Sequence, residues 1–384
     1  MNHTTMARPI YLDYNASTPI APEVADAMRP FLSEHYGNPS SQHWAGAPAK
    51  LAVEKARNQV AALLGCAPQE IIFTSGGTEA NNHAIKGAFF SLRQKGNHII
   101  TTQVEHPAVL QPCGFLKTLG AEVTCLPVDG TGAVNPDDIR KALTPRTILV
   151  SVMHANNEVG TIQPIAEIGR ITREQGVLLH TDAAQSVGKI PTKVAELGVD
   201  LLSVAGHKLY APKGVGALYI RQGVQLEPLM HGAGHEAGRR AGTENILLDV
   251  ALGMACELAE ADLESRRARL AKLRDYFHAG IKDLFGPALH LNGHPTKRLP
   301  NTLNVSFAGR IGSEVLETLD GVAASTGSAC HSGRRELSPV LQAMGASENI
   351  GLGAVRFSLG RWTTIEELDC VLGLLRSHVL KLQP

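Results

Sequence analysis

The chain has 384 residues, of which 43% are hydrophobic and 19% charged, a balance typical of a globular protein. Lys and Arg together number 36, as do Asp and Glu, so the formal charge is zero and no dedicated basic surface for nucleic acid or a membrane is expected. No apolar run could span a bilayer, residues 1–9 lack the apolar core of a signal peptide, and the six cysteines form no CxxC pair. We therefore expect a cytoplasmic protein without a zinc site or a disulfide framework.

The first two thirds of the chain alternates helices with short apolar strands. Apolar residues follow helical spacing from Ala49 to Gly65, where the glycine ends the helix. Strands are expected at Glu70–Thr74, His98–Thr102, Glu122–Leu126, Thr147–Met153, Val177–Thr181, Leu201–Ala205 and Gly216–Arg221. Helical stretches between most of them imply a mostly parallel sheet covered on both faces, with ligands at the carboxyl ends of the strands.

The last third indicates a smaller α+β domain. One long helical stretch runs from Asn245 to about Phe285 and is expected to bridge the two domains. After it come expected strands at Asn301–Phe307 and Ala354–Ser358, a Gly/Ser-rich loop at Ser325–Pro339 and a helix from Thr364. We predict a large cofactor-binding domain of residues 15–260 and a small domain of residues 1–14 and 261–384.

A lysine and an aspartate follow two successive apolar runs. Lys208 comes directly after Val199–Ala205, and Asp182 ends the preceding run. A lysine just past a buried strand can be desolvated, hence partly neutral, and can form a Schiff base with an aldehyde. An aspartate at a neighbouring strand end can keep a pyridinium nitrogen protonated. Either residue alone could be a solvated side chain or a helix cap, but together they indicate a site for pyridoxal 5'-phosphate (PLP).

The segment Thr74–Thr78 lies at a strand-to-helix junction and contains two glycines. Glycines let the backbone approach a phosphate, and free amides at the start of a helix supply donors. The segment matches neither the GxGxxG motif of dinucleotide-binding proteins nor a P-loop. A phosphate site and an ordinary tight turn with a capping box both agree with this pattern.

Three further residues are candidates that also have ordinary structural explanations. His106 follows a strand, where an imidazole could stack on a flat cofactor ring and act as acid or base, or could be structural. Asn156 follows another strand and could offer an amide to a ring oxygen, although asparagine commonly forms turns. Arg356 on an apolar strand needs an anion, either a substrate carboxylate or an internal ion-pair partner.

Cys330 lies among small residues in the segment Ser325–Gly333, which favours an accessible loop. His331 and the pair Arg334–Arg335 would favour the thiolate. Cys330 is therefore a candidate nucleophile, with a free surface thiol as the alternative. The other five cysteines are expected to be core or surface thiols, and no metal site is expected.

Together these motifs resemble those of the PLP-dependent cysteine desulfurases, within the class V aminotransferases of fold-type I. The resemblance covers nearly the whole chain and implies an α/β fold, with a large domain built on a mostly parallel sheet and a smaller α+β domain. It also implies a homodimer. The segments that carry it are Tyr11–Pro19, Gly37–Ser41, Thr74–Glu79, His154–Gly160, His180–Gln185, Gly206–Gly214, Gly238–Asn245, Ser328–Cys330 and Arg356–Arg361.

The resemblance also implies how PLP would be held. Lys208 would carry the cofactor, Asp182 would pair with the ring nitrogen, and His106 would stack on the ring. Gln185 and Asn156 would face the side of the phenolic oxygen. The residues expected around the phosphate are Gly77, Thr78, Ala205 and His207, with Thr243 reaching in from a partner subunit. Ala205 stands where many relatives have a Ser or Thr donor, so one contact with the phosphate is expected to be missing.

The reaction that the resemblance implies converts L-cysteine to L-alanine and leaves sulfur as a persulfide on Cys330. Arg356 and Asn156 would bind the substrate, and Lys208 and His106 would move protons. The extended segment after Cys330 is similar to that of relatives that deliver sulfur to acceptor proteins. The acceptor remains open between iron–sulfur assembly, tRNA thiolation and DNA phosphorothioation.

Three other functions are compatible with parts of this pattern. Cys330-His331-Ser332 resembles selenocysteine lyases, because many desulfurases have a Thr after the catalytic cysteine. A class V aminotransferase would need a keto-acid acceptor and no essential cysteine. A non-catalytic sulfur-relay scaffold would need none of Lys208, Asp182 and Arg356, so their presence counts against it.

Overall fold

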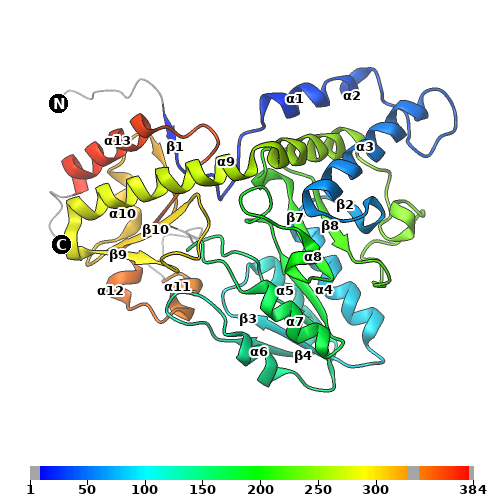
Figure 1. Ribbon diagram of the computed structural model, residues 1–384, viewed down its shortest axis with the longest axis horizontal. Helices are drawn as coiled ribbons and strands as arrows, with labels where there is room; N and C mark the ends of the chain where they lie inside the picture. The colour runs from blue at the N-terminus through cyan, green and yellow to red at the C-terminus, as the bar shows by residue number, and fades with distance from the viewer. Residues whose placement is uncertain (1–8, 327–336, 380–384) are drawn as a thin grey trace.

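The computed structural model describes residues 9–326 and 337–379. Two units lie at the two ends of its long axis, and helix α9 (Ile246–Phe285) runs from one to the other (Figure 1). The large unit contains a seven-stranded sheet, and the small unit contains a three-stranded sheet. No helix in the described ranges is both long enough and apolar enough to cross a membrane.

The sheet of the large unit has the strand order β2-β8-β7-β6-β5-β3-β4. The pairs from β4 through β7 are parallel, whereas β8 pairs antiparallel with both β7 and β2. The strands are β2 (Ile71–Thr74), β3 (His98–Thr102), β4 (Glu122–Leu126), β5 (Thr147–Ser151), β6 (Leu178–Asp182), β7 (Leu201–Ala205) and β8 (Gly216–Ile220).

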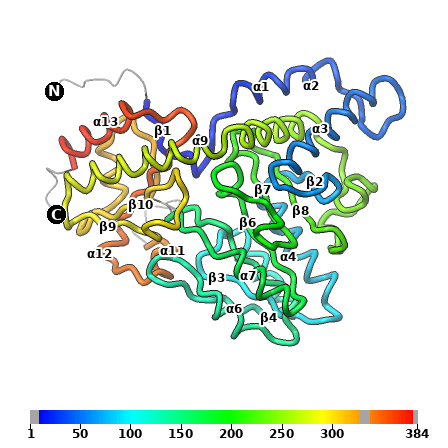
Figure 2. Tube along the Cα trace, in the orientation of Figure 1, coloured from blue at the N-terminus to red at the C-terminus, as the bar shows by residue number. Residues whose placement is uncertain are grey.

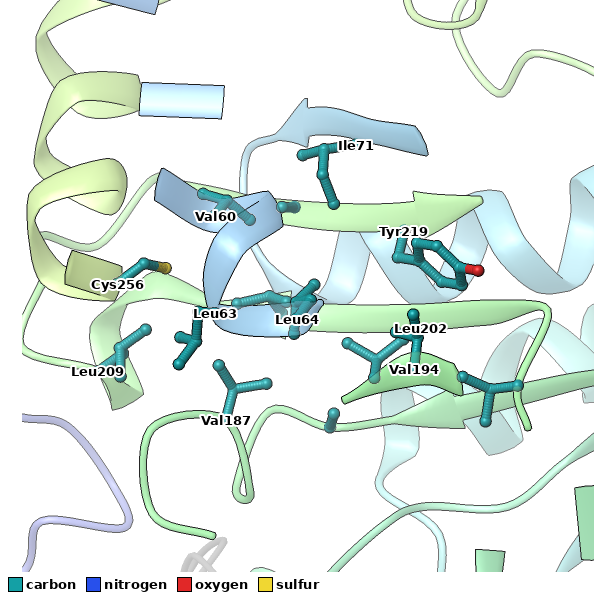
Figure 3. Packing of buried hydrophobic residues seen from close by; sticks show 14 of the residues in the cluster. Val60, Leu63, Leu64, Ile71, Val187, Val194, Leu202, Leu209, Tyr219 and Cys256 are labelled. Atoms are coloured by element: carbon teal, nitrogen blue, oxygen red, sulfur yellow. The ribbon is translucent and has the colours of Figure 1, made fainter. Parts of the chain in front are cut away.

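Neighbouring residues on a strand point to opposite sides of the sheet, so the continuous apolar strands of this sheet make both of its faces apolar. Leu202 faces the core cluster that includes α3 and α9, whereas Leu201 faces the cluster built on α4 and α5. Figure 3 shows the first cluster, in which Leu63 and Leu64 of α3 pack near Leu202 and Cys256. The helices of this unit are α1 (Pro22–Met28), α2 (Pro30–Ser33), α3 (Gly46–Leu64), α4 (Gly77–Leu92), α5 (Pro107–Lys117), α6 (Pro136–Ala142), α7 (Ile165–Glu174) and α8 (Val194–Leu197).

The small unit packs its sheet against the second half of α9. Its antiparallel sheet has the order β12-β10-β9, and β1 pairs with β11. Figure 2 shows β1, β9 and β10 in this unit, beside α9. The chain start therefore joins this unit, with Ile10 and Leu12 in the same core as Phe277 of α9. The elements are β1 (Ile10–Tyr11), β9 (Leu289–Asn292), β10 (Thr302–Phe307), α10 (Gly312–Glu317), β11 (Val322–Ala323), α11 (Pro339–Ala343), α12 (Glu348–Gly351), β12 (Ala354–Ser358) and α13 (Ile365–Leu374).

The strands expected at His98–Thr102, Glu122–Leu126, Leu201–Ala205 and Ala354–Ser358 are confirmed at those bounds. The other expected strands are present with ends that differ by one or two residues. The predicted domain boundary at residue 260 falls inside α9, close to a break in helical backbone at Asp262 (φ −127°, ψ 15°). That boundary stays a prediction, and the two core clusters lie on either side of it.

Candidate active site

A cavity of about 530 Å³ opens where the carboxyl ends of the parallel strands face the small unit. Such a position is where open α/β sheets bind their ligands. Of the residues predicted from the sequence, the cavity is lined by Gly77, Thr78, His106, Asp182, Gln185, Ala205, His207, Lys208 and Arg356. Segments far apart in the chain thus bring the amine of Lys208, the carboxylate of Asp182, two imidazoles and a guanidinium to a single site.

Asp182 is the last residue of β6 and is buried in the cavity wall. One oxygen of its carboxylate accepts from Nδ2 of Asn81 at 2.7 Å, and the other accepts from the amide of Ala184 at 2.9 Å. These two donors fix the direction of the carboxylate. Asn81 was not predicted from the sequence, and its place on the buried face of α4 is the signal that could have identified it.

Lys208 ends the short 3-10 turn η2 (Gly206–Lys208) that follows β7. Its Nζ donates to the carbonyls of Asn15 at 2.5 Å and Ala16 at 2.7 Å. Burial, and next the positive charge of Arg356, lower the pKa of Lys208 from 10.5 to about 8. A minor fraction of the amine, far larger than for an ordinary lysine, is therefore neutral near physiological pH and can act as a nucleophile or a base.

His106 precedes the first turn of α5 and caps it with its side chain. Its Nδ1 accepts from the amide of Ala108 at 3.1 Å, which assigns the proton of the neutral ring to Nε2. Burial lowers the pKa of His106, and the nearby Asp182 opposes that shift in part. The ring is therefore neutral at pH 7 and presents an N–H donor.

Glu105 directly precedes His106 in the chain and was not predicted from the sequence. Its carboxyl group accepts from the hydroxyl of Thr102 at 2.7 Å and from the amide of Met153 at 3.0 Å. Full burial raises the pKa of Glu105 to about 8, although these hydrogen bonds oppose the shift. Glu105 thus ties the end of β3 to the chain after β5, and Met153 itself lines the cavity.

The start of α4 forms an anion cradle. Gly76 has φ 148° and provides no side-chain cap, so the first amides of the helix face the cavity at Gly77 and Thr78. The approach is tight, because a Cβ on Gly77 would lie 3.2 Å from Cβ of Ala205. Nδ1 of His207 is buried beside this cradle and has no hydrogen-bond partner among the described residues. These groups together call for an anionic ligand such as a phosphate.

Arg356 reaches the cavity from β12 of the small unit. Its guanidinium donates to the carboxylate of Asp13 at 2.7 Å and to the carbonyl of Asn157 at 2.9 Å. Nε of Arg356 is buried and finds no partner within the described ranges. The side chain therefore retains a donor for a further acceptor in the cavity, such as a carboxylate.

The structure places Asn156 and Asn157 differently from the sequence-based expectation. Asn156 is fully buried and does not line the cavity: its Oδ1 accepts from the amides of Glu158 and Val159, and its Nδ2 donates to the carbonyl of Val104. Asn157 lines the cavity instead. Asn156 thus holds the loop that carries Asn157, a turn-forming role common for asparagine.

Two further predicted residues are not part of the cavity wall as described. Thr243 is exposed on the surface of the chain, in the loop before α9. Cys330 lies outside the described residues. The chain on either side of it is tied to the site, since Ser325 pairs with the backbone of Arg356 and Ser338 donates to Glu158 at 2.7 Å.

Comparison with known proteins gives consistent matches along the whole chain. The family model for aminotransferase class-V matches residues 10–371. The cysteine desulfurase IscS of Dictyoglomus turgidum is 51% identical over 380 residues, with 98% of this chain and 96% of that protein covered. A solved NifS-like protein superposes with a TM-score of 0.91 at 39% identity, covering 97% of this chain and 100% of that one. The structure of SspA in complex with cysteine has a TM-score of 0.82 at 38% identity, covering 92% and 100%.

The chain has the fold of the class V aminotransferases, an α/β architecture of fold-type I, as predicted from the sequence. Within that class the chain belongs to the cysteine desulfurase family. The resemblance drawn from the motifs is thereby confirmed.

Proposed function

We propose that the protein is a PLP-dependent cysteine desulfurase that converts L-cysteine to L-alanine and passes the sulfur, through a persulfide on Cys330, to an acceptor protein. The observation that carries the proposal is the single cavity in which Lys208, Asp182, the start of α4 and Arg356 meet. The relatives named cysteine desulfurases, and the structural relative with bound cysteine, support the choice of substrate.

The residues of the cavity fit PLP. The amine of Lys208 can link to its aldehyde, and the fixed carboxylate of Asp182 suits a protonated ring nitrogen. The first amides of α4 and Nδ1 of His207, which has no partner among the described residues, suit its phosphate. Gln185 and the neutral ring of His106 would complete the contacts. When bound, PLP supplies an electron sink next to the α-carbon of the amino acid.

The residues of the chain would bind the substrate, transfer protons and accept the sulfur. Arg356 holds the substrate carboxylate through its free donor, and Asn157 adds a polar group on the same wall. Lys208, with its lowered pKa, takes and returns a proton, and Nε2–H of His106 donates to the reacting side of the site. The thiolate of Cys330 attacks the substrate sulfur: the S–S bond forms, the carbon–sulfur bond breaks, and its electron pair stays on carbon, which is then protonated to alanine.

The proposal also covers the oligomeric state, the compartment and the sulfur acceptor. We infer a homodimer in which Thr243 of one chain contacts the phosphate at the other site, which its exposure in the single chain supports. A reactive thiol at Cys330 suits a reducing compartment, so we place the protein in the cytoplasm. The sulfur acceptor is a protein, and the neutral net charge gives no reason to expect contact with a membrane or with nucleic acid.

A product assay tests this function. Purified protein loaded with PLP is incubated with L-cysteine and a thiol reductant, and alanine and sulfide are measured together. Equal amounts of both are expected, and Lys208→Ala should form neither. Selenocysteine is assayed in parallel. Much faster turnover of selenocysteine, with little or no alanine from cysteine, would favour the lyase, whereas alanine that requires a keto acid would favour an aminotransferase.

A further inference from the structure

Lys189 is a half-buried lysine that the proposed chemistry does not use. It follows Asp182 by seven residues and lies in the chain segment after β6. Its Nζ donates to Oε1 of Gln185 at 2.8 Å and to Oδ1 of Asn15 at 3.1 Å. Both partners line the cavity, and both are neutral amides. Because a half-buried amine with no carboxylate partner among the described residues is costly to charge, such a residue calls for a functional explanation.

The hydrogen bonds of Lys189 match the direction in which the amides point. The carbonyl of Asn15 can only accept, so the atom of Gln185 that faces it is the nitrogen, and the oxygen of that amide faces the donating Nζ of Lys189. Nε2 of Gln185 is then on the other side, where one N–H donates to the carbonyl of Asn15 at 2.9 Å. The second N–H of the same nitrogen has no partner within the described ranges and is left for a ligand in the cavity.

The amide of Asn15 is fixed in the same way. Its Oδ1 accepts from Lys189 and also from Nδ2 of Asn301 at 3.0 Å. Its Nδ2 therefore donates to the hydroxyl of Thr302 at 2.8 Å and to the carbonyl of Asn157 at 3.2 Å. The carbonyl of Asn15 accepts from Lys208, so Lys189 orients the residue that also holds the reactive amine.

The charges around Lys189 come from elements of both units. Lys208 and His207 face it from the turn after β7, and Arg356 faces it from β12. The carboxylates in this region are Asp182 and Asp13, and Asp13 pairs with Arg356. Burial, followed by repulsion from Lys208 and Arg356, lowers the pKa of Lys189 well below its usual value. Among the described residues, the lysine is thus held in place by its two amide acceptors and by no ion pair.

We propose, on the basis of the PLP site proposed above, that Lys189 is a positioning residue for the cofactor. It fixes the side-chain amides of Gln185 and Asn15 and so presents an N–H of Gln185 to the phenolic oxygen of PLP. Lys189 itself touches neither cofactor nor substrate. A purely structural role, a tie between the chain start and the segment after β6, would leave the cofactor's spectrum and affinity unchanged in a folded variant.

The test measures PLP binding to the apo-protein and the pH at which the visible band of the PLP-loaded protein changes. Lys189→Met removes the donors at similar size, whereas Lys189→Gln keeps neutral donors. Lys193→Met is the control, because that lysine lies four residues on and bonds Ala62 and Glu260 outside the cavity. We expect Lys189→Met to weaken PLP binding about tenfold, as for one lost oriented donor. The band should also move to higher pH because the phenolic oxygen loses a donor.

Lys189→Gln should recover most of the affinity, and Lys193→Met should behave as wild type. In a Gln185→Leu background, Lys189→Met should add little, since the donor that it orients is gone. Unchanged affinity and spectrum in folded Lys189→Met would overturn the proposal. If Lys189→Met does not fold, Lys189→Ala decides, because it also removes the donors: an equal effect with and without Gln185 overturns the proposal, and a smaller effect without Gln185 supports it. Wild-type protein that forms no covalent PLP link would instead overturn the proposed function.

Discussion

The guanidinium of Arg356 and the carboxylate of Asp13 form an ion pair of 2.7 Å at the edge of the cavity. Asp13 belongs to the chain start, whereas Arg356 belongs to β12, so the pair joins two distant segments of the small unit. The pair orients the guanidinium, whose buried Nε has no partner in the part of the chain that the structure describes. A cysteine carboxylate would therefore meet an arginine that is already held in place, which lowers the entropy cost of binding.

Arg356→Lys should raise KM for cysteine by about tenfold or more, because a lysine keeps the charge but loses the planar fork. The absorption spectrum of bound PLP should stay unchanged, since Arg356 is not expected to contact the cofactor. Arg361→Lys is a matched control, because Arg361 pairs with Glu23 outside the cavity. Steady-state kinetics would show the effect, and an unchanged KM would remove Arg356 from substrate binding.

The lowered pKa of Lys208 predicts the pH dependence of cofactor capture. Below its pKa the amine is protonated and cannot attack the aldehyde, so the rate of PLP capture by apo-protein should rise with pH and be half-maximal near pH 8. Arg356→Gln removes a positive charge that lowers this pKa, so the midpoint should move to higher pH. Stopped-flow absorbance measures the rate. A midpoint that is above pH 10 in wild type would contradict the buried setting of Lys208.

Much of the fold was predictable because local sequence patterns carry it. Continuous apolar runs marked strands such as Leu201–Ala205, and Gly65 marked the end of α3, where it adopts φ 68°. The strand Leu289–Asn292 was missed, since it is short and its burial depends on pairing with β10. Its apolar residues alternate with polar ones over only four positions, too few to separate a strand from a loop.

The site was predicted where single residues stand at strand ends, and it was missed where partners come from distant segments. Sequence alone could not choose between Asn156 and Asn157, because the choice depends on which amides the turn presents to Oδ1 of Asn156. Asn81 and Lys189 act through contacts made only in the folded chain. Lys189 did leave a signal, a lysine within the otherwise apolar run Val187–Ile190.

Ala205→Ser should strengthen PLP binding. Ala205 lies beside Gly77 at the anion cradle, where a hydroxyl could donate to the phosphate. One such hydrogen bond contributes roughly 0.5–1.5 kcal/mol, or about two- to tenfold in affinity. Titration of apo-protein with PLP measures the change, with Ala211→Ser as a control at a buried alanine outside the cavity. Equal or weaker affinity would mean that other donors already saturate the phosphate.

Thr243 should act across the subunit interface. A mixture of Lys208→Ala and Thr243→Ala chains forms hybrid dimers in which one site lacks both groups and the other is intact. Activity above that of either parent is therefore expected after subunits exchange, and it is measured as alanine formed from cysteine. No recovery in confirmed hybrids would place Thr243 in its own chain's site or outside the site altogether.

The reaction itself is tested most directly by replacing the proposed sulfur acceptor. Cys330→Ala protein loaded with PLP is mixed with L-cysteine, and alanine is measured, with Cys125→Ala as a control at an exposed cysteine of β4. We expect no alanine above background in Cys330→Ala, an unchanged cofactor spectrum, and normal turnover in Cys125→Ala. Part of the activity on selenocysteine should survive, because selenium leaves carbon with less assistance from a nucleophile. Full alanine formation from cysteine in Cys330→Ala would contradict the account and remove Cys330 from the mechanism.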